Sequence, residues 1–158
     1  MKAVVIYESL TGNTAKAGQL IAEELTAYGI ETSACPINQV NLPALSEADL
    51  VIVGAWTDGL VFAGQKPGRD WRLRKMPVID GKRAAVYCTY AVKHGKTLPK
   101  LERIVRMRGG EMIGGYAIHR NKMQEGVTEF VGRVLSALDA PADSAPADRA
   151  PADEATDD

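Results

Sequence analysis

The chain has 158 residues, of which 46% are hydrophobic and 25% are charged, and its net charge is −1, which is typical of one soluble globular domain. No apolar run approaches the roughly 20 residues that span a bilayer, and Met1 leads directly into a predicted strand rather than a signal peptide, so we expect a cytoplasmic protein with no membrane span. Cys35 and Cys88 form no CxxC motif, and His94 and His119 add no metal-ligand spacing. We therefore expect no metal site and two buried, reduced thiols.

Strand and helix patterns alternate through the first 138 residues. Continuous apolar runs predict buried strands, and apolar residues spaced three or four apart predict amphipathic helices. Gly29 and Gly109 are expected to end the helices that precede them. In chain order we predict a strand at 2–7, a helix at 13–28, a strand at 30–36, a short helix at about 41–47, a strand at 49–55, a loop at 56–67, a basic helical piece at 68–75, a strand at 83–89, a helix at 95–107, a strand at 111–118 and a helix at 122–138.

Five strands with helical crossovers predict an α/β fold, a doubly wound five-stranded parallel sheet with helices on both faces. The common strand order for such a sheet is 2-1-3-4-5, with the ligand at the switch point between strands one and three. This arrangement brings the loops after strands one, three and four around one ligand. In this chain those loops are 8–14, 56–65 and 89–96.

The first of these loops favours a bound phosphate. Small hydroxyl and amide residues stand between the end of a strand and the start of a helix, where free backbone N–H groups and the positive end of the helix dipole converge. The loop has neither the GxxxxGK[ST] nor the GxGxxG pattern, so a P-loop or a dinucleotide fingerprint is not expected. The alternative is an ordinary capped helix start. The residues concerned are Ser9, Leu10, Thr11, Gly12, Asn13 and Thr14.

The segment VVIYESLTGNTAKAGQLIAEEL closely resembles the N-terminal signature of flavodoxins. GAWTDG and CTYAVKHGKT match the second and third loops of that family in position. The resemblance covers the chain to about residue 138, and the uninterrupted strand EMIGGYAI is similar to that of short-chain members. It implies a flavodoxin-like fold that binds FMN.

The resemblance also implies which residues bind the cofactor. The first loop, 9–14, would wrap the phosphate, and the other two loops would sandwich the flavin ring. No catalytic residue is implied. The expected ring-flanking residues are Ala55, Trp56, Thr57, Asp58, Gly59, Thr89, Tyr90 and Gly95.

The second loop departs from the family pattern. Asp58 occupies the usual aromatic position, and Trp56 lies two residues earlier. Trp56 or Phe62 would supply a stacking face from a shifted position, or Trp56 is simply core. Asp58 near the ring would disfavour an anionic reduced flavin. Asp58-Gly59 is also a dipeptide typical of turns, and a surface turn with no redox role is the alternative.

In the third loop, Tyr90 would cover the outer face of the ring, or it packs the loop on the following helix. His94 would contact a substrate or donate a proton, although an exposed loop histidine is the more ordinary expectation. We expect Cys88, at the end of the preceding strand, to have a packing role.

Charge is divided unevenly along the chain. Residues 139–158 hold seven of the 20 acids and one of the 19 bases, which leaves 13 acids and 18 bases before them. This last segment repeats Ala-Pro-Ala-Asp and has no bulky apolar residue, so it cannot offset its ordering entropy by burial. We expect a folded domain at 1–138 and a disordered acidic tail at 139–158 that keeps the chain soluble.

The folded part carries basic residues after the second and third loops. A positive rim favours an acidic protein partner or an anionic small molecule. No recognition motif accompanies these charges, so nucleic acid is not expected. A further hypothesis is that the acidic tail folds back over the rim. The basic residues are Arg69, Arg72, Arg74, Lys75, Lys93, Lys96, Lys100 and Arg103.

Three functions fit these features. The first is an FMN-binding electron-transfer protein that turns over no substrate. The second is an FMN-dependent oxidoreductase of quinone or porphyrinogen type. The third is a flavin-free module of the same fold that binds a protein partner, and fold alone does not choose among them.

Overall fold

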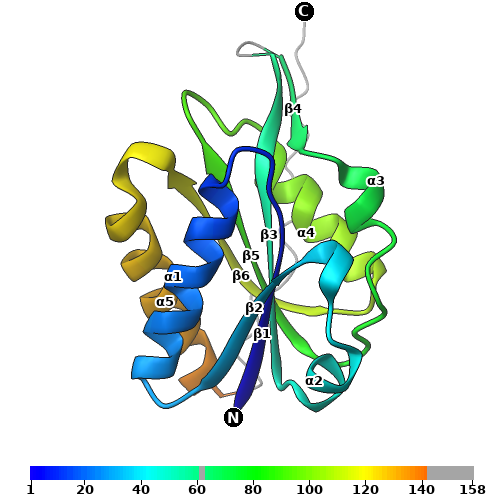
Figure 1. The fold of residues 1–158 in the computed structure, drawn as a ribbon, viewed down its shortest axis with the longest axis vertical. Coiled ribbons are helices and arrows are strands. Elements are labelled where there is room, and N and C mark those ends of the chain that lie inside the picture. The colour runs from blue at the N-terminus through cyan, green and yellow to red at the C-terminus, as the bar shows by residue number, and fades with distance from the viewer. Residues whose placement is uncertain (61–62, 142–158) are drawn as a thin grey trace, which may run out of the picture.

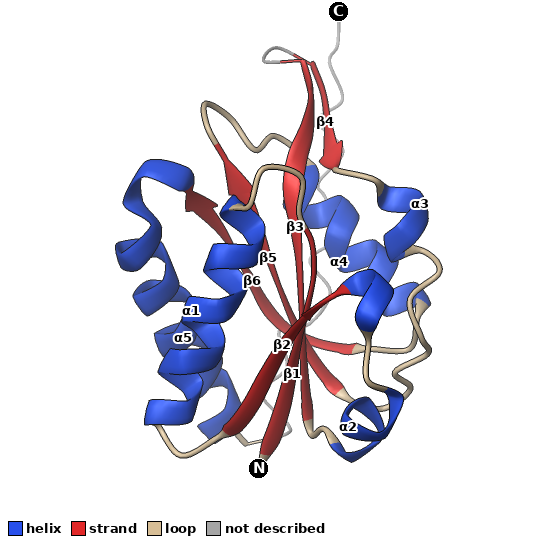
Figure 2. Ribbon diagram, viewed as in Figure 1, coloured by secondary structure: helices blue, strands red, loops and turns tan. Residues whose placement is uncertain are grey.

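A mostly parallel sheet lies between two layers of helices (Figures 1 and 2). The computed structural model describes residues 1–60 and 63–141. The strand order is β2-β1-β3-β5-β6, all parallel, which confirms the predicted 2-1-3-4-5 order. These strands are β1 (Lys2–Glu8), β2 (Glu31–Pro36), β3 (Leu50–Leu60), β5 (Arg83–Tyr90) and β6 (Glu111–His119).

Each face of the sheet packs against its own set of helices. Helices α1 (Asn13–Ala27) and α5 (Met123–Asp139) cover one face, and α2 (Leu42–Glu47), α3 (Asp70–Leu73) and α4 (Thr97–Met107) lie on the other (Figure 2). Along β1 and β3, side chains pack alternately into the apolar core on one face of the sheet and the apolar core on the other. This is why the central strands are apolar on both faces. Two short 3-10 turns, Ile37–Gln39 and Arg120–Lys122, complete the elements.

The predicted loop at 56–67 is wrong. β3 continues to Leu60, and β4 (Ala63–Pro67) pairs back on it antiparallel, so the sheet has six strands. Thr57 pairs with Pro67, and the backbone N–H of Gly68 donates to the Trp56 carbonyl at 2.8 Å. Polar residues with little strand propensity are held extended here by cross-strand hydrogen bonds. The strand propensities of individual residues do not reveal such pairing. The resulting hairpin rises beyond the carboxyl ends of the other strands (Figure 1).

Asp58-Gly59 is consequently not a turn. The register of the hairpin shifts between Asp58 and Leu60, and Gly59 has φ = 120° at this bulge. A glycine suits a bulge because it adopts positive φ without a Cβ clash.

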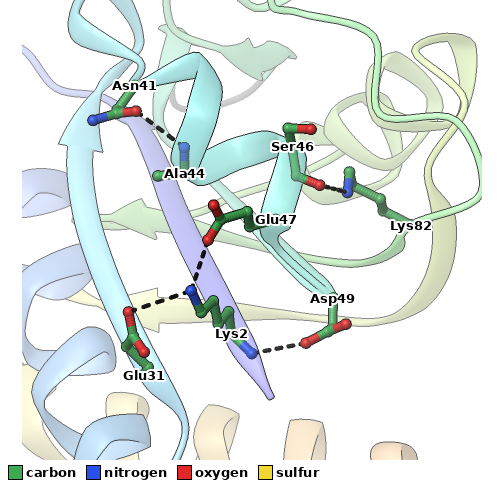
Figure 3. A network of polar contacts seen from close by, with 8 residues as sticks. All are labelled: Lys2, Glu31, Asn41, Ala44, Ser46, Glu47, Asp49 and Lys82. Atoms are coloured by element: carbon green, nitrogen blue, oxygen red, sulfur yellow. Dashed lines mark hydrogen bonds and ion pairs between the residues drawn. The ribbon is translucent and has the colours of Figure 1, made fainter.

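The opposite, amino-terminal end of the sheet is tied by a network of polar contacts around Lys2 (Figure 3). The Lys2 ammonium lies 2.6 Å from Glu47 and 4.0 Å from Glu31. Its hydrogen bond with Glu47 raises the pKa of Lys2 and lowers the pKa of Glu47. Asn41 caps α2 by accepting a hydrogen bond from the Ala44 N–H at 3.0 Å. The network fixes the base of the sheet, far from its carboxyl edge.

The remaining predicted elements agree with the structure to within about two residues at each end, except that the basic piece at 68–75 shortens to α3. Helix α5 ends at Asp139, and the predicted tail, like Phe62, lies outside the described residues, apart from positions 139–141. Across 1–60 and 63–141, no helix has the length and apolar character needed to cross a membrane.

Candidate functional site

The loop between β1 and α1 presents a run of free backbone donors. Gly12 precedes α1 with φ = 95°, which turns the chain sharply into the helix. Within the described residues, the five N–H groups of residues 10–14 have no hydrogen-bond acceptor. Free N–H groups at the start of a 15-residue helix form a concave site for an anion. A Cβ placed on Gly12 would meet nothing within 4 Å, so the approach to these donors is open.

Side chains of the same loop add to the donor set. Ser9 Oγ accepts a hydrogen bond from the Ala15 N–H at 3.2 Å, so Ser9 also serves as a helix cap. The Asn13 amide donates to Thr11 Oγ1 at 3.4 Å, and Thr11 is exposed. Leu10 is exposed as well. The loop thus has a capped helix start and also free donors that could hold an anion, so the structure is compatible with both roles that the sequence left open.

Thr14 points inward rather than to the surface of the loop. Its Oγ1 lies 2.7 Å from Oγ1 of Thr89, at the end of β5, and both residues are buried. The Tyr87 hydroxyl donates to the Thr14 carbonyl at 2.8 Å. One hydrogen bond between two hydroxyls uses one of their two protons, so this pair retains a proton for a further acceptor. The first and third loops are therefore joined directly.

A buried ion pair that sequence analysis missed lies directly before the first loop. Glu8, the last residue of β1, has a side chain that is 4% exposed, and its Oε1 is 2.9 Å from Arg69 and 3.5 Å from Arg72. A buried carboxylate is stable only when it is paired. Arg69 has a left-handed backbone conformation, with φ = 48°. The one available signal was an acid at the end of an apolar strand, since its partners lie more than 60 residues away.

Trp56 does not stand free beside the second loop. Its indole lies against the backbone of Gly68, where any Cβ would collide with the ring. Ala55 is fully buried in the core on the α4 side of the sheet. Burial raises the pKa of the neighbouring Cys88 thiol to about 12, and the Thr57 hydroxyl offsets only part of this rise. These contacts support the packing role expected for Cys88, and they leave Trp56 with one face covered.

The third loop carries a small aromatic cluster. The Tyr90 ring makes edge contacts with His94 and His119, with centroids 5.0 and 5.1 Å apart. His94 is half-buried rather than exposed as expected. Gly95 lies against the Gln65 side chain of β4, so the hairpin and the third loop are in contact.

Unpaired polar atoms gather at this edge of the sheet. Among the described residues, five buried side-chain polar atoms lack a hydrogen bond, and four of them lie in the second loop, the third loop or the first turn of α4. A buried polar atom without a hydrogen-bond partner lowers the stability of the fold by about 1–3 kcal/mol. A group of such atoms therefore indicates a place where a polar ligand supplies the missing hydrogen bonds. The four are Trp56 Nε1, Thr57 Oγ1, His94 Nδ1 and Thr97 Oγ1. The Thr57 hydroxyl lies near the Cys88 thiol, but the two groups do not have the geometry of a hydrogen bond.

Comparison with known proteins agrees with this geometry. A family model described as "Flavodoxin domain" matches residues 4–157. The chain belongs to the flavodoxin family. A flavodoxin from Clostridium beijerinckii is 28% identical over 105 residues, which is 66% of this chain and 75% of that protein.

Solved flavodoxins share the fold. Oxidised flavodoxin 1 from Bacillus cereus superposes with a TM-score of 0.65 at 20% identity, covering 86% of this chain and 98% of that one. A flavodoxin from the domain Archaea gives 0.64 at 19% identity, covering 87% and 99%.

Flavodoxins bind FMN, and the donor set present here fits that cofactor. The five free N–H groups of the first loop suit a phosphate dianion. The unpaired hydroxyl, indole and imidazole atoms suit the polar edge of a flavin ring. The fit is less direct for the ring faces, because Trp56 packs on Gly68 and Tyr90 is held between two histidines.

Proposed function

We propose that this flavodoxin-family chain is an FMN-dependent electron carrier that binds its cofactor through the residues at the carboxyl edge of the sheet. The observation that carries the proposal is the run of five unpaired N–H groups at the start of α1, beside the hydroxyl pair that links the first and third loops. FMN, when bound, supplies a ring that takes up and releases electrons one at a time.

Each loop then has a separate task. Residues 9–14 hold the phosphate, and the hydroxyl pair of Thr14 and Thr89 offers it one further donor. Thr57, Tyr90 and Gly95 flank the ring, with the hairpin shielding it from water. Asp58, half-buried in β3 with Oδ1 bound by the Gly59 N–H at 2.9 Å, places a negative charge beside the ring. Such a charge disfavours an anionic ring and lowers the potential of the second electron.

The redox partner is an acidic protein. Lys93 and Lys96 in the third loop are exposed, as are Lys100 and Arg103 on α4. The rim is less positive over α3 than the sequence suggested, because Arg69 and Arg72 pair with Glu8, and Arg74 lies 3.5 Å from Asp70. The charge that remains available stands on the β4–α4 side, where it favours an approaching negative surface.

A spectroscopic experiment tests the carrier proposal. Purified protein titrated with FMN is expected to turn yellow with a stoichiometry of one, and stepwise photoreduction is expected to resolve two one-electron steps. A protein that takes up no FMN would contradict the proposal and favour a flavin-free binding module. A single two-electron step would contradict the carrier role alone.

A substrate-reducing enzyme is the second candidate, on one specific observation. A hollow of about 310 Å³ opens beside the third loop, lined by Tyr90, Tyr116, His119 and residues of α5. His119 Nδ1 accepts a hydrogen bond from the Asn121 N–H at 3.1 Å, so the neutral ring carries its proton on Nε2. Rapid quinone reduction with a nicotinamide donor that is lost in His119→Phe would favour the enzyme.

A further inference from the structure

A basic hollow with an exposed tryptophan beside it lies on the α3–α4 side of the molecule. The hollow, about 300 Å³, is lined by four cationic side chains, one carboxylate, and the apolar Pro67 and Ile104. The carboxylate, Asp70, is already engaged by Arg74 at 3.5 Å. We call this hollow together with Trp71 the α3–α4 basic surface. Its cations are Lys66, Arg74, Lys100 and Arg103.

Trp71 follows Asp70 on α3 and is the exposed aromatic residue of this surface. It is 54% exposed, an uncommon state for the largest apolar side chain. The Arg72 guanidinium and the Lys75 ammonium lie 5.2 and 5.6 Å from its ring centre. Tryptophan and arginine are the residues most enriched at the energetic centres of protein interfaces. The indole therefore offers an anchor, and since Arg72 is already paired with Glu8, the Lys75 ammonium supplies the charge preference beside it.

The surface is held in place before any partner arrives. The Lys100 ammonium donates to the Gln65 carbonyl of β4 at 3.0 Å, which ties the hairpin to α4. Gly95 contacts the Gln65 side chain from the third loop. A surface already fixed loses less conformational entropy on binding.

Its position suits electron transfer. β4 is the return strand of the hairpin that forms the second loop, and α4 begins directly after the third loop. α3, β4 and the start of α4 lie side by side near the carboxyl end of the sheet (Figure 1). A protein docked there lies beside the two loops that are proposed to flank the flavin.

We propose that the α3–α4 basic surface is the docking site for an acidic redox protein, with Trp71 as its anchor and the hollow receiving carboxylate side chains. The proposal rests on the carrier function above. Charge complementarity favours an acidic partner, because three cations of the hollow have no carboxylate to balance them once Asp70 is paired with Arg74. The apolar floor of Pro67 and Ile104 suits the aliphatic stems of glutamate better than a bare phosphate.

The test uses the full FMN-loaded chain and an acidic blue-copper protein as the probe. In the first variant, Arg103→Glu is combined with Lys66→Gln. The matched control combines Arg133→Glu with Lys16→Gln, which makes the same change of charge at exposed positions on α5 and α1, across the sheet from α4 (Figure 2). Trp71→Ala is compared with Tyr28→Ala, another exposed aromatic. Electron transfer from the reduced protein is followed by stopped flow at about 20 and about 300 mM ionic strength, which bracket strong and weak screening.

The first variant is expected to lower the low-salt rate at least about tenfold and to abolish its salt dependence, while the control changes it less than about threefold. Trp71→Ala is expected to lower the rate at both salt concentrations. Equal losses in variant and control, or none in either, would overturn the docking site. Self-association of the wild type that Trp71→Ala abolishes would also overturn it, since the surface would then bind a second copy.

Two further measurements separate this proposal from the carrier proposal. Ferricyanide, a small acceptor that needs no docking, reports whether each variant still releases electrons. Amide chemical shifts on titration with the zinc-substituted probe report docking even without FMN. Shifts grouped at 66–75 and 100–103 support the site whether or not the protein is yellow, and shifts grouped elsewhere overturn it.

Discussion

The hydroxyl oxygens of Thr14 and Thr89 lie 2.7 Å apart at the point where the first turn of α1 meets the end of β5. Residues 75 positions apart in the chain are thereby joined where the first and third loops meet. Neither hydroxyl has water as an alternative partner, because the two residues are 1% and 4% exposed. If these residues bind FMN as proposed, the contact links fold stability and cofactor binding in one pair of side chains.

Thr14→Ala is expected to destabilise the FMN-free protein by about 1–3 kcal/mol, because it leaves the Thr89 hydroxyl buried without a partner. Thr14→Ser keeps the hydroxyl and serves as the control. Urea unfolding followed by far-UV circular dichroism measures the difference. Equal losses in the two variants would show that the methyl group, rather than the hydrogen bond, carries the stability.

Thr11→Ala probes the phosphate contact without disturbing the core, since Thr11 is exposed. Loss of a hydrogen bond to a charged acceptor is worth about 1.5–3 kcal/mol, so FMN affinity should fall at least about tenfold. Riboflavin, which lacks the phosphate, is expected to bind both proteins equally. Calorimetric titration with the two flavins checks this, and an unchanged FMN affinity would mean that the loop acts only as a helix cap.

The Glu8 ion pairs are expected to tune phosphate binding. Replacing Arg69 and Arg72 by Met leaves a buried carboxylate next to Ser9, and it should weaken FMN binding about fivefold more than riboflavin binding, because only FMN carries the dianion. Adding Glu8→Gln removes the uncompensated charge and should restore most of the FMN affinity. If the triple variant binds as poorly as the double variant, the arginines act through packing instead.

The raised pKa of Cys88 leads us to expect that the folded protein loses stability at alkaline pH. The Cys88 thiol titrates at about 12 in the folded protein, above the ordinary value of 9.0. The unfolded chain therefore loses this proton first as the pH rises. Stability associated with the neutral thiol is complete below pH 9 and falls by about 1.4 kcal/mol per pH unit between 9 and 12. Denaturant unfolding of the wild type across this range should be steeper with pH than that of Cys88→Ala, and parallel curves would contradict the assignment.

Truncation after Pro141 tests the proposal that the acidic tail covers the basic rim. It leaves α5 intact, including the Leu138 carbonyl that accepts a hydrogen bond from Arg83 at 3.3 Å. At low salt the shortened protein is expected to bind the acidic probe more tightly, because an intramolecular competitor has been removed. A tail in which the six acids of residues 143–158 are replaced by Asn or Gln gives the matched control for charge, and equal affinity in all three proteins would exclude the idea.

Sequence patterns sufficed for the sheet order and for the position of the first loop between β1 and α1. The apolar runs of β1 and β3 and the glycine-terminated helices have local causes, so periodicity and turn residues reveal them. The hairpin was missed because Asp58 and Gly59 are weak strand formers whose extended conformation depends on pairing with β4.

The candidate site also has parts that depend on local sequence and parts that depend on contacts between distant segments. Backbone donors at a helix start follow from chain order alone, and so residues 9–14 could be proposed from the sequence. The Glu8 ion pairs and the Thr14–Thr89 contact join segments more than 60 residues apart, and no local pattern encodes them. The sequence left two roles open for Trp56, stacking on the flavin ring and packing in the core. Its neighbour Gly68 is brought close by the strand pairing, which the sequence did not reveal.

The contact between Trp56 and Gly68 gives a way to recognise chains built like this one. No side chain fits at position 68 while the indole keeps its place. A relative that has both residues at the same spacing is expected to share the hairpin and to keep its tryptophan away from one side of the cofactor. A relative that retains the tryptophan but has a larger residue at position 68 must turn the indole elsewhere. Position 68 is therefore the place at which a larger side chain would force the Trp56 indole into another orientation.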